Sequence, residues 1–209
     1  MLVLVSRRYN YTELWVTLKM FIARGHTFEI ASTHQVIRSE TSTDYNRVQR
    51  LVSEVPSMKG FDGIVIISGN PEDTEKFWYD RHVQDLVQEA SRTDLTIAGI
   101  CAAVPAIRPA VRNKKVSYYP LIRSRDLLTE AGALLQTTSL STDGRVVTAE
   151  NESVTTMWAT NICDVAEGKS PTYVLNPSTF KRKLRERKPI KELEALKKIT
   201  SNTGKKGLK

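Results

Sequence analysis

The chain has 209 residues, of which 40% are hydrophobic and 26% are charged, within the ordinary range for a soluble globular protein. Two cysteines, Cys101 and Cys163, are too few for a disulfide framework or a four-cysteine zinc site. Apolar runs such as 2–5 and 64–67 are far too short to cross a bilayer, and Arg7 and Arg8 follow the first run at once, unlike a signal peptide. We therefore expect a cytoplasmic protein that does not bind membranes.

The net charge of +8 is distributed unevenly along the chain. Residues 169–209 hold 13 of the 31 Lys+Arg and 3 of the 23 Asp+Glu, so residues 1–168 hold 18 basic and 20 acidic residues. We therefore predict a near-neutral domain over 1–168 and a basic C-terminal extension over 169–209. The extension could bind nucleic acid or an acidic partner. It contains a single Phe and a single Tyr, which gives little support for base stacking, and a solvated tail without a partner is the other interpretation.

Strands and helices are predicted to alternate along the first 168 residues. In chain order, we expect a strand over 2–5, a helix over 12–24, a strand over 27–31, a short helix within 45–55, a strand over 61–67, a helix over 80–91, a strand over 95–100, a helix-like segment over 105–111, a strand over 133–137, a hairpin turn at 142–145, a strand over 146–149 and a helix over 153–166. This alternation predicts an α/β domain with a mainly parallel sheet.

Cys101 lies where the predicted strand 95–100 gives way to a helix-like segment. Ligands of parallel α/β sheets bind beyond the carboxyl ends of the strands, so a thiol at this position would face the binding crevice. Backbone N–H groups at the start of a helix would favour its thiolate and could stabilise an oxyanion. A cysteine after an apolar strand is also commonly a small buried core residue, and that structural interpretation stays open.

Several segments, in the same order, resemble the ThiJ/PfpI superfamily, which includes the parkinsonism-associated protein deglycases and the intracellular proteases. The segment Ile-Ala-Gly-Ile-Cys-Ala-Ala at 97–103 resembles the nucleophile segment of that family, and 61–70 resembles its strand ending in Pro-Gly-Gly. Further matches lie at 115–120, 130–133, 143–149 and the helix ending at 167–168. The resemblance implies a flavodoxin-like three-layer sandwich, of the class I glutamine amidotransferase-like kind, over residues 1–168.

The resemblance also implies a set of site residues. Glu13, in the segment 11–14, matches the acid that the family places beside its cysteine, and a carboxyl held there could donate a hydrogen bond to the thiolate. Without the resemblance, Glu13 is an ordinary acid in the first turn of a helix. Backbone donors are expected at Gly69, Asn70 and Ala102, and Tyr119 is expected at the pocket, where many members have a histidine.

The sequence departs from the family pattern at three places. Many members have a histidine directly after the cysteine or in a later segment, and these positions hold Ala102 and Tyr119. Gly69-Asn70 replaces the family's Gly-Gly, and the segment 102–105 replaces a turn that usually contains glycine. A nucleophile–base pair is therefore not evident from the sequence. The three histidines of the chain are His26, His34 and His82.

Two functional hypotheses follow from the resemblance. The first is a protein whose Cys101 acts on small carbonyl or acyl compounds in a glyoxalase-, deglycase- or hydrolase-like reaction, or senses oxidants as a sulfinate, with neither metal nor organic cofactor. The second is a catalytically weak or inactive member that serves as a binding or structural protein, recruited to an anionic partner by its basic extension. Homodimers are common in the family, so self-association is expected as well.

Overall fold

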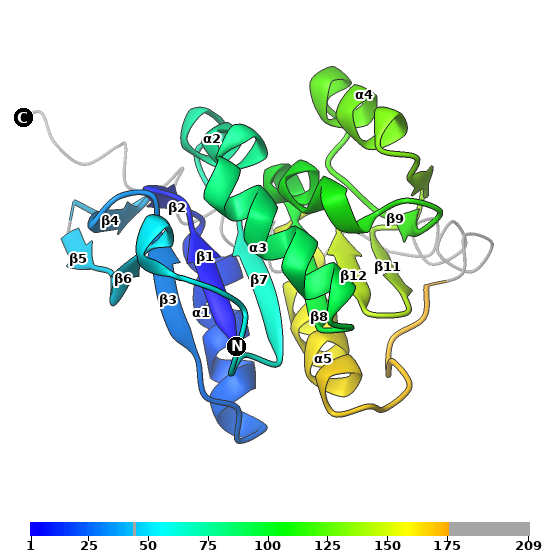
Figure 1. Cartoon of the computed structure of the whole chain (residues 1–209), viewed down its shortest axis with the longest axis horizontal. Helices are drawn as coiled ribbons and strands as arrows, with labels where there is room; N and C mark the ends of the chain where they lie inside the picture. The colour runs from blue at the N-terminus through cyan, green and yellow to red at the C-terminus, as the bar shows by residue number, and fades with distance from the viewer. Residues whose placement is uncertain (44, 176–209) are drawn as a thin grey trace, which may run out of the picture. The chain divides into compact units, whose positions relative to one another are not determined.

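A seven-stranded sheet with helices on both faces organises residues 1–43 and 45–175, which the computed structural model describes (Figure 1). The strand order is β11-β12-β8-β7-β1-β3-β6, and each neighbouring pair is parallel except β11 and β12. This architecture confirms the predicted flavodoxin-like α/β fold. The strands are β1 (Leu2–Val5), β3 (Glu29–Ser32), β6 (Arg50–Leu51), β7 (Gly63–Ile67), β8 (Thr96–Ile100), β11 (Leu140–Asp143) and β12 (Val146–Ala149).

The helices divide between the two faces of the sheet (Figure 1). One face packs against α1 (Tyr11–Ala23) and α5 (Thr155–Ala166), and the other against α2 (Pro71–Tyr79), α3 (Arg81–Arg92), the 3₁₀ helix η2 (Cys101–Ala110) and α4 (Ile122–Glu130). The remaining elements are β2 (Arg8–Tyr9), β4 (Val36–Ser39), β5 (Tyr45–Arg47), β9 (Lys115–Val116), β10 (Leu134–Leu135), η1 (Val52–Glu54) and η3 (Glu152–Val154). Among the helices of the described ranges, none is both long and apolar enough to span a membrane.

Strand β7 shows why a continuous apolar run suits the centre of this sheet. Ile64 and Ile66 point into the core that contains Trp78, whereas Val65 and Ile67 point into the core that contains Trp158. All four β7 side chains are fully buried, because helices cover both faces. At roughly 25 cal/mol per Å² of buried apolar surface, these two cores provide the main stabilisation of the sheet.

The sequence predictions differ from the structure at three helical segments. The short helix predicted within 45–55 is reduced to the single 3₁₀ turn η1, because β5 pairs with β4 and β6 extends the main sheet beside β3. The polar, weakly patterned sequence here is held by strand pairing that no local signal reveals. Helix α2 was not predicted, although Pro71 at its first position and two acids in its first turn are ordinary helix-start signals. Helix α4 was missed as well.

The order of the strands places the functional edge of the sheet. From β1 the chain proceeds to β3 and β6 on one side and to β7, β8 and β12 on the other, so the strand order reverses at β1 and β7. Open α/β sheets bind ligands at the carboxyl ends of the strands near this reversal. Ser68 directly follows β7 and Cys101 directly follows β8, so both lie at that edge.

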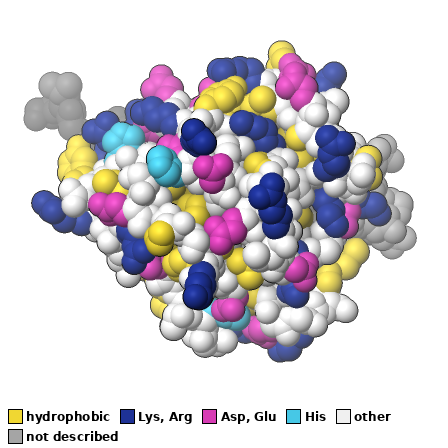
Figure 2. All heavy atoms as spheres, viewed as in Figure 1, with side chains coloured by type: hydrophobic (Ala, Val, Ile, Leu, Met, Phe, Trp, Pro, Cys, Tyr) yellow, Lys and Arg dark blue, Asp and Glu magenta, His cyan; other side chains and the backbone are white. Residues whose placement is uncertain are grey.

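The basic extension is described as far as residue 175, and Phe180 with the remaining cationic residues lies outside the described residues. The compact unit identified from contacts is Met1–Leu175. On the face of the molecule seen in Figure 2, basic and acidic side chains are intermixed. This agrees with the near-neutral composition of residues 1–168.

Candidate active site

Cys101 occupies a sharp elbow between strand β8 and helix η2. Its φ angle is +54°, a left-handed conformation that is strained for a residue other than glycine, and its side chain is partly buried. A strand-to-helix turn of this kind presents a nucleophilic side chain at the edge of an α/β sheet. Gly99 permits the turn, because a Cβ there would lie 3.2 Å from the Cα of Val104.

Two side chains from neighbouring helices hold the start of η2 in place. The indole Nε1 of Trp78 donates a buried hydrogen bond of 2.7 Å to the carbonyl oxygen of Ala102. The side-chain amide of Gln84 donates to the carbonyl oxygen of Ala106 at 2.9 Å. These bonds satisfy carbonyl groups that an irregular 3₁₀ helix interrupted by prolines would leave without partners. The elbow is therefore positioned from outside as well as by its own backbone.

Glu13 is placed in the first turn of α1 by the cap of that helix. The side-chain oxygen of Asn10 accepts a hydrogen bond of 3.0 Å from the backbone N–H of Glu13. The backbone N–H of Asn10 donates to the carbonyl oxygen of Ser68 at 2.9 Å. The Glu13 side chain is 1% exposed. Its Oε2 accepts two hydrogen bonds from Ser68, one from the amide at 2.9 Å and one from the hydroxyl at 2.7 Å. Glu13 therefore points at the end of β7 and not into solvent.

The negative charge of Glu13 acts on the thiol of Cys101. Burial raises the pKa of Glu13 to about 7, while the two hydrogen bonds from Ser68 work in the opposite direction. Burial also raises the pKa of the Cys101 thiol to about 11, and the nearby negative charge of Glu13 adds to this increase. Protonation of Glu13 removes that charge and with it this part of the increase in the thiol pKa. The resemblance implied this proximity, and the structure places the two groups near each other.

The expectation that the elbow favours the thiolate is not met by these surroundings. The Ala102 amide and the Ser68 hydroxyl do lower the pKa of Cys101, but burial and the Glu13 charge outweigh them. At neutral pH the thiol therefore keeps its proton. A reaction at Cys101 then needs a group that removes this proton as the sulfur attacks, and Glu13 has a pKa suited to that task.

The three predicted backbone donors, the amides of Ala102, Asn70 and Gly69, have different surroundings in the structure. The amide of Ala102 lies beside the sulfur, and its role as an oxyanion donor stays a prediction. The prediction for Asn70 is wrong, because its amide already donates to the carbonyl oxygen of Arg8 at 2.7 Å. Gly69 is packed against the chain at Tyr9, with which it forms an antiparallel bridge. A donor role for the Gly69 amide stays a prediction.

Tyr119 is 41% exposed, and the groups found to act on Cys101 are Glu13, Ser68, Ala102 and Glu152. The pocket role of Tyr119 therefore stays a prediction. Each of the three histidines has another partner. His26 contacts Glu167 at 3.1 Å, His34 contacts Thr33 at 3.0 Å, and His82 lies 3.8 Å from Asp80.

Sequence reasoning did not identify the acidic rim of the site, which Glu40 and Glu152 form. Charge on Glu152 and on Glu40 raises the pKa of Glu13. Burial raises the pKa of Glu40, and the charge of Glu152 adds to the effect, whereas Arg8 opposes it. Asn10 holds Glu152 through a hydrogen bond of 2.7 Å. These residues are far apart in the sequence, and the spacing of acids gave no signal for them.

Within the described part of the chain, no group of three His, Cys, Asp or Glu side chains is arranged to hold a metal ion.

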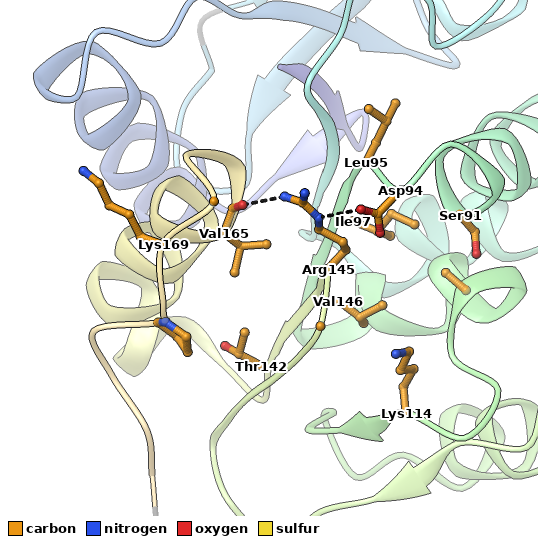
Figure 3. A pocket seen from close by; sticks show the side chains of 14 residues that line it. Ser91, Asp94, Leu95, Ile97, Lys114, Thr142, Arg145, Val146, Val165 and Lys169 are labelled. Atoms are coloured by element: carbon orange, nitrogen blue, oxygen red, sulfur yellow. Dashed lines mark hydrogen bonds and ion pairs between the residues drawn. The ribbon is translucent and has the colours of Figure 1, made fainter.

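A cavity of about 530 Å³ lies at the opposite edge of the sheet, beside the residues that begin β8 and β12 (Figure 3). Arg145 crosses it, donating to Asp94 at 3.2 Å and to the carbonyl oxygen of Val165 at 2.7 Å. The two lysines of its lining, Lys114 and Lys169, also have acidic partners, at 3.7 and 2.6 Å. Its charges are therefore already paired, and it contains neither Cys101 nor Glu13.

The protein is an α/β protein whose mainly parallel sheet is covered by helices on both faces. It carries a cysteine at a strand-to-helix elbow and a buried acid beside that cysteine. Residues 1–164 match the model of the DJ-1/PfpI family. The chain belongs to this family. It is 21% identical over 169 residues to an uncharacterized protein of Methanocaldococcus jannaschii, a match that covers 80% of this chain and 82% of that protein.

Solved structures share the fold at low sequence identity. A ThiJ/PfpI domain protein from Brachyspira murdochii has a TM-score of 0.71 at 19% identity, over 81% of this chain and 96% of that chain. Schizosaccharomyces pombe DJ-1 has a TM-score of 0.67 at 15% identity, over 90% and 98% of the two chains. Drosophila melanogaster DJ-1beta has a TM-score of 0.68 at 17% identity, over 80% and 90%. These similarities establish the architecture.

Proposed function

We propose that this DJ-1/PfpI-family protein uses the Cys101 thiol to add to small carbonyl or acyl compounds, with Glu13 as the group that takes up and returns the proton. The observation that supports this most directly is the pairing itself: a partly buried thiol at a strained elbow beside a buried carboxyl with a pKa of about 7. A base whose pKa lies near the working pH is effective in proton transfer.

With an aldehyde, the proposed reaction is a reversible addition. The sulfur of Cys101 forms a bond to the carbonyl carbon while its proton passes to Glu13. The carbonyl oxygen then takes a proton back from Glu13, which leaves a hemithioacetal and an ionised carboxyl. The Ala102 amide, which lies beside the sulfur, stabilises negative charge on that atom during the transfer. Neither a metal nor an organic cofactor takes part in this sequence.

The charges around the thiol favour an uncharged substrate. In addition to burial, the charges of Glu152 and Glu40 raise the pKa of Glu13, and the charge of Glu152 raises that of Glu40, so the surroundings of the thiol are rich in negative charge. Arg8 offsets part of this charge, but it is engaged by Asp73 at 2.6 Å. A carboxylate- or phosphate-bearing compound would be repelled. We therefore favour a small neutral aldehyde or ketone over an anionic acyl compound.

Oxidant sensing by Cys101 is less well supported than carbonyl addition. Thiolates are oxidised much faster than thiols, and the raised pKa of Cys101 keeps it protonated at neutral pH. In the addition reaction, by contrast, Glu13 removes the proton during the attack. The surroundings of Cys101 therefore disfavour its oxidation and permit carbonyl addition.

Incubation with methylglyoxal, a small neutral α-oxoaldehyde, tests the proposal. We expect a Cys101 adduct in rapid-quench mass spectrometry, absent in Cys101→Ser and formed at least about tenfold more slowly in Glu13→Gln. The matched control is Cys163→Ser, which removes the other, fully buried cysteine and should leave the adduct on Cys101 unchanged. Equal modification of the wild type and Cys101→Ser would contradict the proposal.

We propose a second, separate role for the basic extension, on the basis of its charge. Residues 176–209 contain 12 of the 13 Lys+Arg of the extension and 3 acids. Phosphate groups of a nucleic acid would interact with such a segment, and the affinity would fall with added salt. Binding of a single-stranded oligonucleotide, measured by fluorescence anisotropy, should be lost on truncation after Leu175 and retained in Cys101→Ser. Unchanged binding by the truncated protein would contradict this role.

A further inference from the structure

The hydroxyl of Ser68 lies between the thiol of Cys101 and the carboxyl of Glu13. Strands β7 and β8 are parallel neighbours with Ile66 opposite Gly99, so the register continued by two residues places Ser68 opposite Cys101. On its other side, Ser68 holds Oε2 of Glu13 through its amide at 2.9 Å and its hydroxyl at 2.7 Å. One short side chain therefore joins the ends of β7 and β8 to the first turn of α1.

The chemistry of a serine side chain suits this position. A hydroxyl has one proton to donate and two lone pairs with which to accept, so it can donate to Glu13 while it accepts from the thiol. Ser68 is 2% exposed, which leaves little room for bulk water to compete for either bond. The hydroxyl is within hydrogen-bonding reach of the Cys101 sulfur: it can accept from the thiol, and once the sulfur is a thiolate it can turn to donate to it, which lowers the pKa of the thiol.

The identity of this residue is informative, because the strand of the family that 61–70 resembles ends in Pro-Gly-Gly and Ser68 stands at the position of the proline. Proline has neither an amide proton nor a hydroxyl. Neither of the two bonds from residue 68 to Glu13 could form with proline in its place. The contact between β7 and the acid therefore depends on the amide proton and the hydroxyl that Ser68 supplies.

We propose that Ser68 relays the proton from the Cys101 thiol to Glu13 during carbonyl addition. This inference rests on the proposed function and specifies the route of its proton. As the sulfur bonds to the carbonyl carbon, the thiol proton moves to the Ser68 oxygen and the Ser68 hydroxyl proton moves to Oε2 of Glu13. Ser68 therefore ends with the same number of protons that it had at the start. Glu13 then releases its proton to the former carbonyl oxygen, so no further reactant is required.

A comparison of two reactions at Cys101 separates the relay from a structural role. Ser68→Ala keeps the hydrogen bond from the backbone N–H of residue 68 to Glu13 and removes the hydroxyl. We expect methylglyoxal addition at about pH 7 to slow by about tenfold or more, the size of a lost acid–base contribution. At about pH 10, roughly a tenth of a thiol with a pKa of about 11 is ionised by solvent. The rate of iodoacetamide alkylation there, divided by the ionised thiol fraction measured in each protein, should change by less than about twofold. Ser68→Thr, which retains a hydroxyl, should recover most of the rate at neutral pH.

A measurement on the unaltered protein provides a second test that does not depend on the folding of a variant. The rate of addition is measured in mixtures of light and heavy water. After correction for the deuterium fractionation of the thiol before reaction, two protons moving together through Ser68 give a curved dependence on the deuterium fraction, whereas one proton passing directly to Glu13 gives a straight line. A straight line overturns the relay, as does a Ser68→Ala protein that reacts at the wild-type rate or loses both reactions equally.

The outcomes also separate failure of the relay from failure of the proposed function. If methylglyoxal modifies Cys101→Ser as readily as the wild type, the proposed function fails and the relay fails with it. If the addition depends on Cys101 and Glu13 but not on the hydroxyl of Ser68, the function stands and only the relay is overturned.

Discussion

Trp78 donates its indole hydrogen bond to the carbonyl oxygen of Ala102, so helix α2 holds the residue that directly follows the candidate nucleophile. Both groups are buried, and the bond is 2.7 Å long. The helix that sequence analysis missed is therefore part of the support of the site. A substitution in α2 should therefore change the reactivity of Cys101, although α2 contributes no reacting group.

Trp78→Phe removes the hydrogen bond to Ala102 and tests whether that bond supports the site. The variant leaves a buried carbonyl without its donor, and we expect the free energy of unfolding in urea to fall by about 1–3 kcal/mol. Trp158→Phe is the matched control, because Trp158 donates a comparable buried bond of 3.1 Å to Val147, in the other core. Both variants should be destabilised, but only Trp78→Phe should alter the rate of Cys101 alkylation. An identical alkylation rate in all three proteins would refute the supporting role of Trp78.

Gly69 should tolerate no side chain. A Cβ at this position would overlap backbone atoms of Arg8 and Tyr9, which cannot move without breaking the bridge between β2 and the end of β7. We expect Gly69→Ala to lose more than about 3 kcal/mol of stability, as in severe overpacking. Gly99→Ala, whose Cβ would meet the Val104 Cα at 3.2 Å, should lose less. Chemical denaturation of the two variants compares them directly, and an equal or reversed order of stability would be inconsistent with this packing.

Glu13 should make the protein less stable as the pH rises. Its pKa is raised to about 7 in the folded protein from an unfolded value of 4.5, so the unfolded chain releases this proton first. Folding stability attributable to Glu13 therefore decreases between these two pH values, by up to about 3 kcal/mol. The stability advantage of Glu13→Gln over wild type should grow from about pH 4 to pH 8. A constant difference across this range in pH-dependent thermal unfolding would show that the acid is not buried.

Arg24 should stabilise the protein by joining the ends of α1 and α5. Its guanidinium contacts Asp164 at 2.9 Å and Glu167 at 2.7 Å, and Asp164 is buried. Arg24→Gln should cost about 1–3 kcal/mol, as expected for hydrogen bonds to charged groups. The pKa of Glu167 is lowered to about 2, largely by Arg24, so this stabilisation is present above about pH 4.5 and is lost as the pH falls toward 2.

The control for Arg24 is Arg81→Gln, which removes an exposed ion pair of 3.7 Å with Asp85 and should change stability by less than about 0.5 kcal/mol. Equal effects of the two substitutions in urea denaturation would contradict the prediction for Arg24.

The sequence was sufficient for the inner strands of the sheet because they are short apolar runs, as in β7 and β8, which need no partner to be recognised. Strand β11, at one edge, was predicted only as part of a hairpin turn. Sequence analysis failed over 45–55 because the pairing of β5 and β6 depends on strands elsewhere in the chain. At the site, Cys101 and Glu13 were identified from motifs. Ser68 was not, because its role depends on the register of two parallel strands and on the approach of α1, which are properties of tertiary structure.

Residues that follow α5 continue to pack against that helix. The amide of Thr172 donates to Asp164 at 2.8 Å, and Tyr173 exchanges two hydrogen bonds with the side chain of Asn161, at 2.7 and 2.9 Å. A shortened protein made for crystallisation or NMR should therefore keep residues 169–175. Cutting at 168 would strip these bonds from the outer side of the last helix and leave the Asn161 amide and the Asp164 carboxyl facing water.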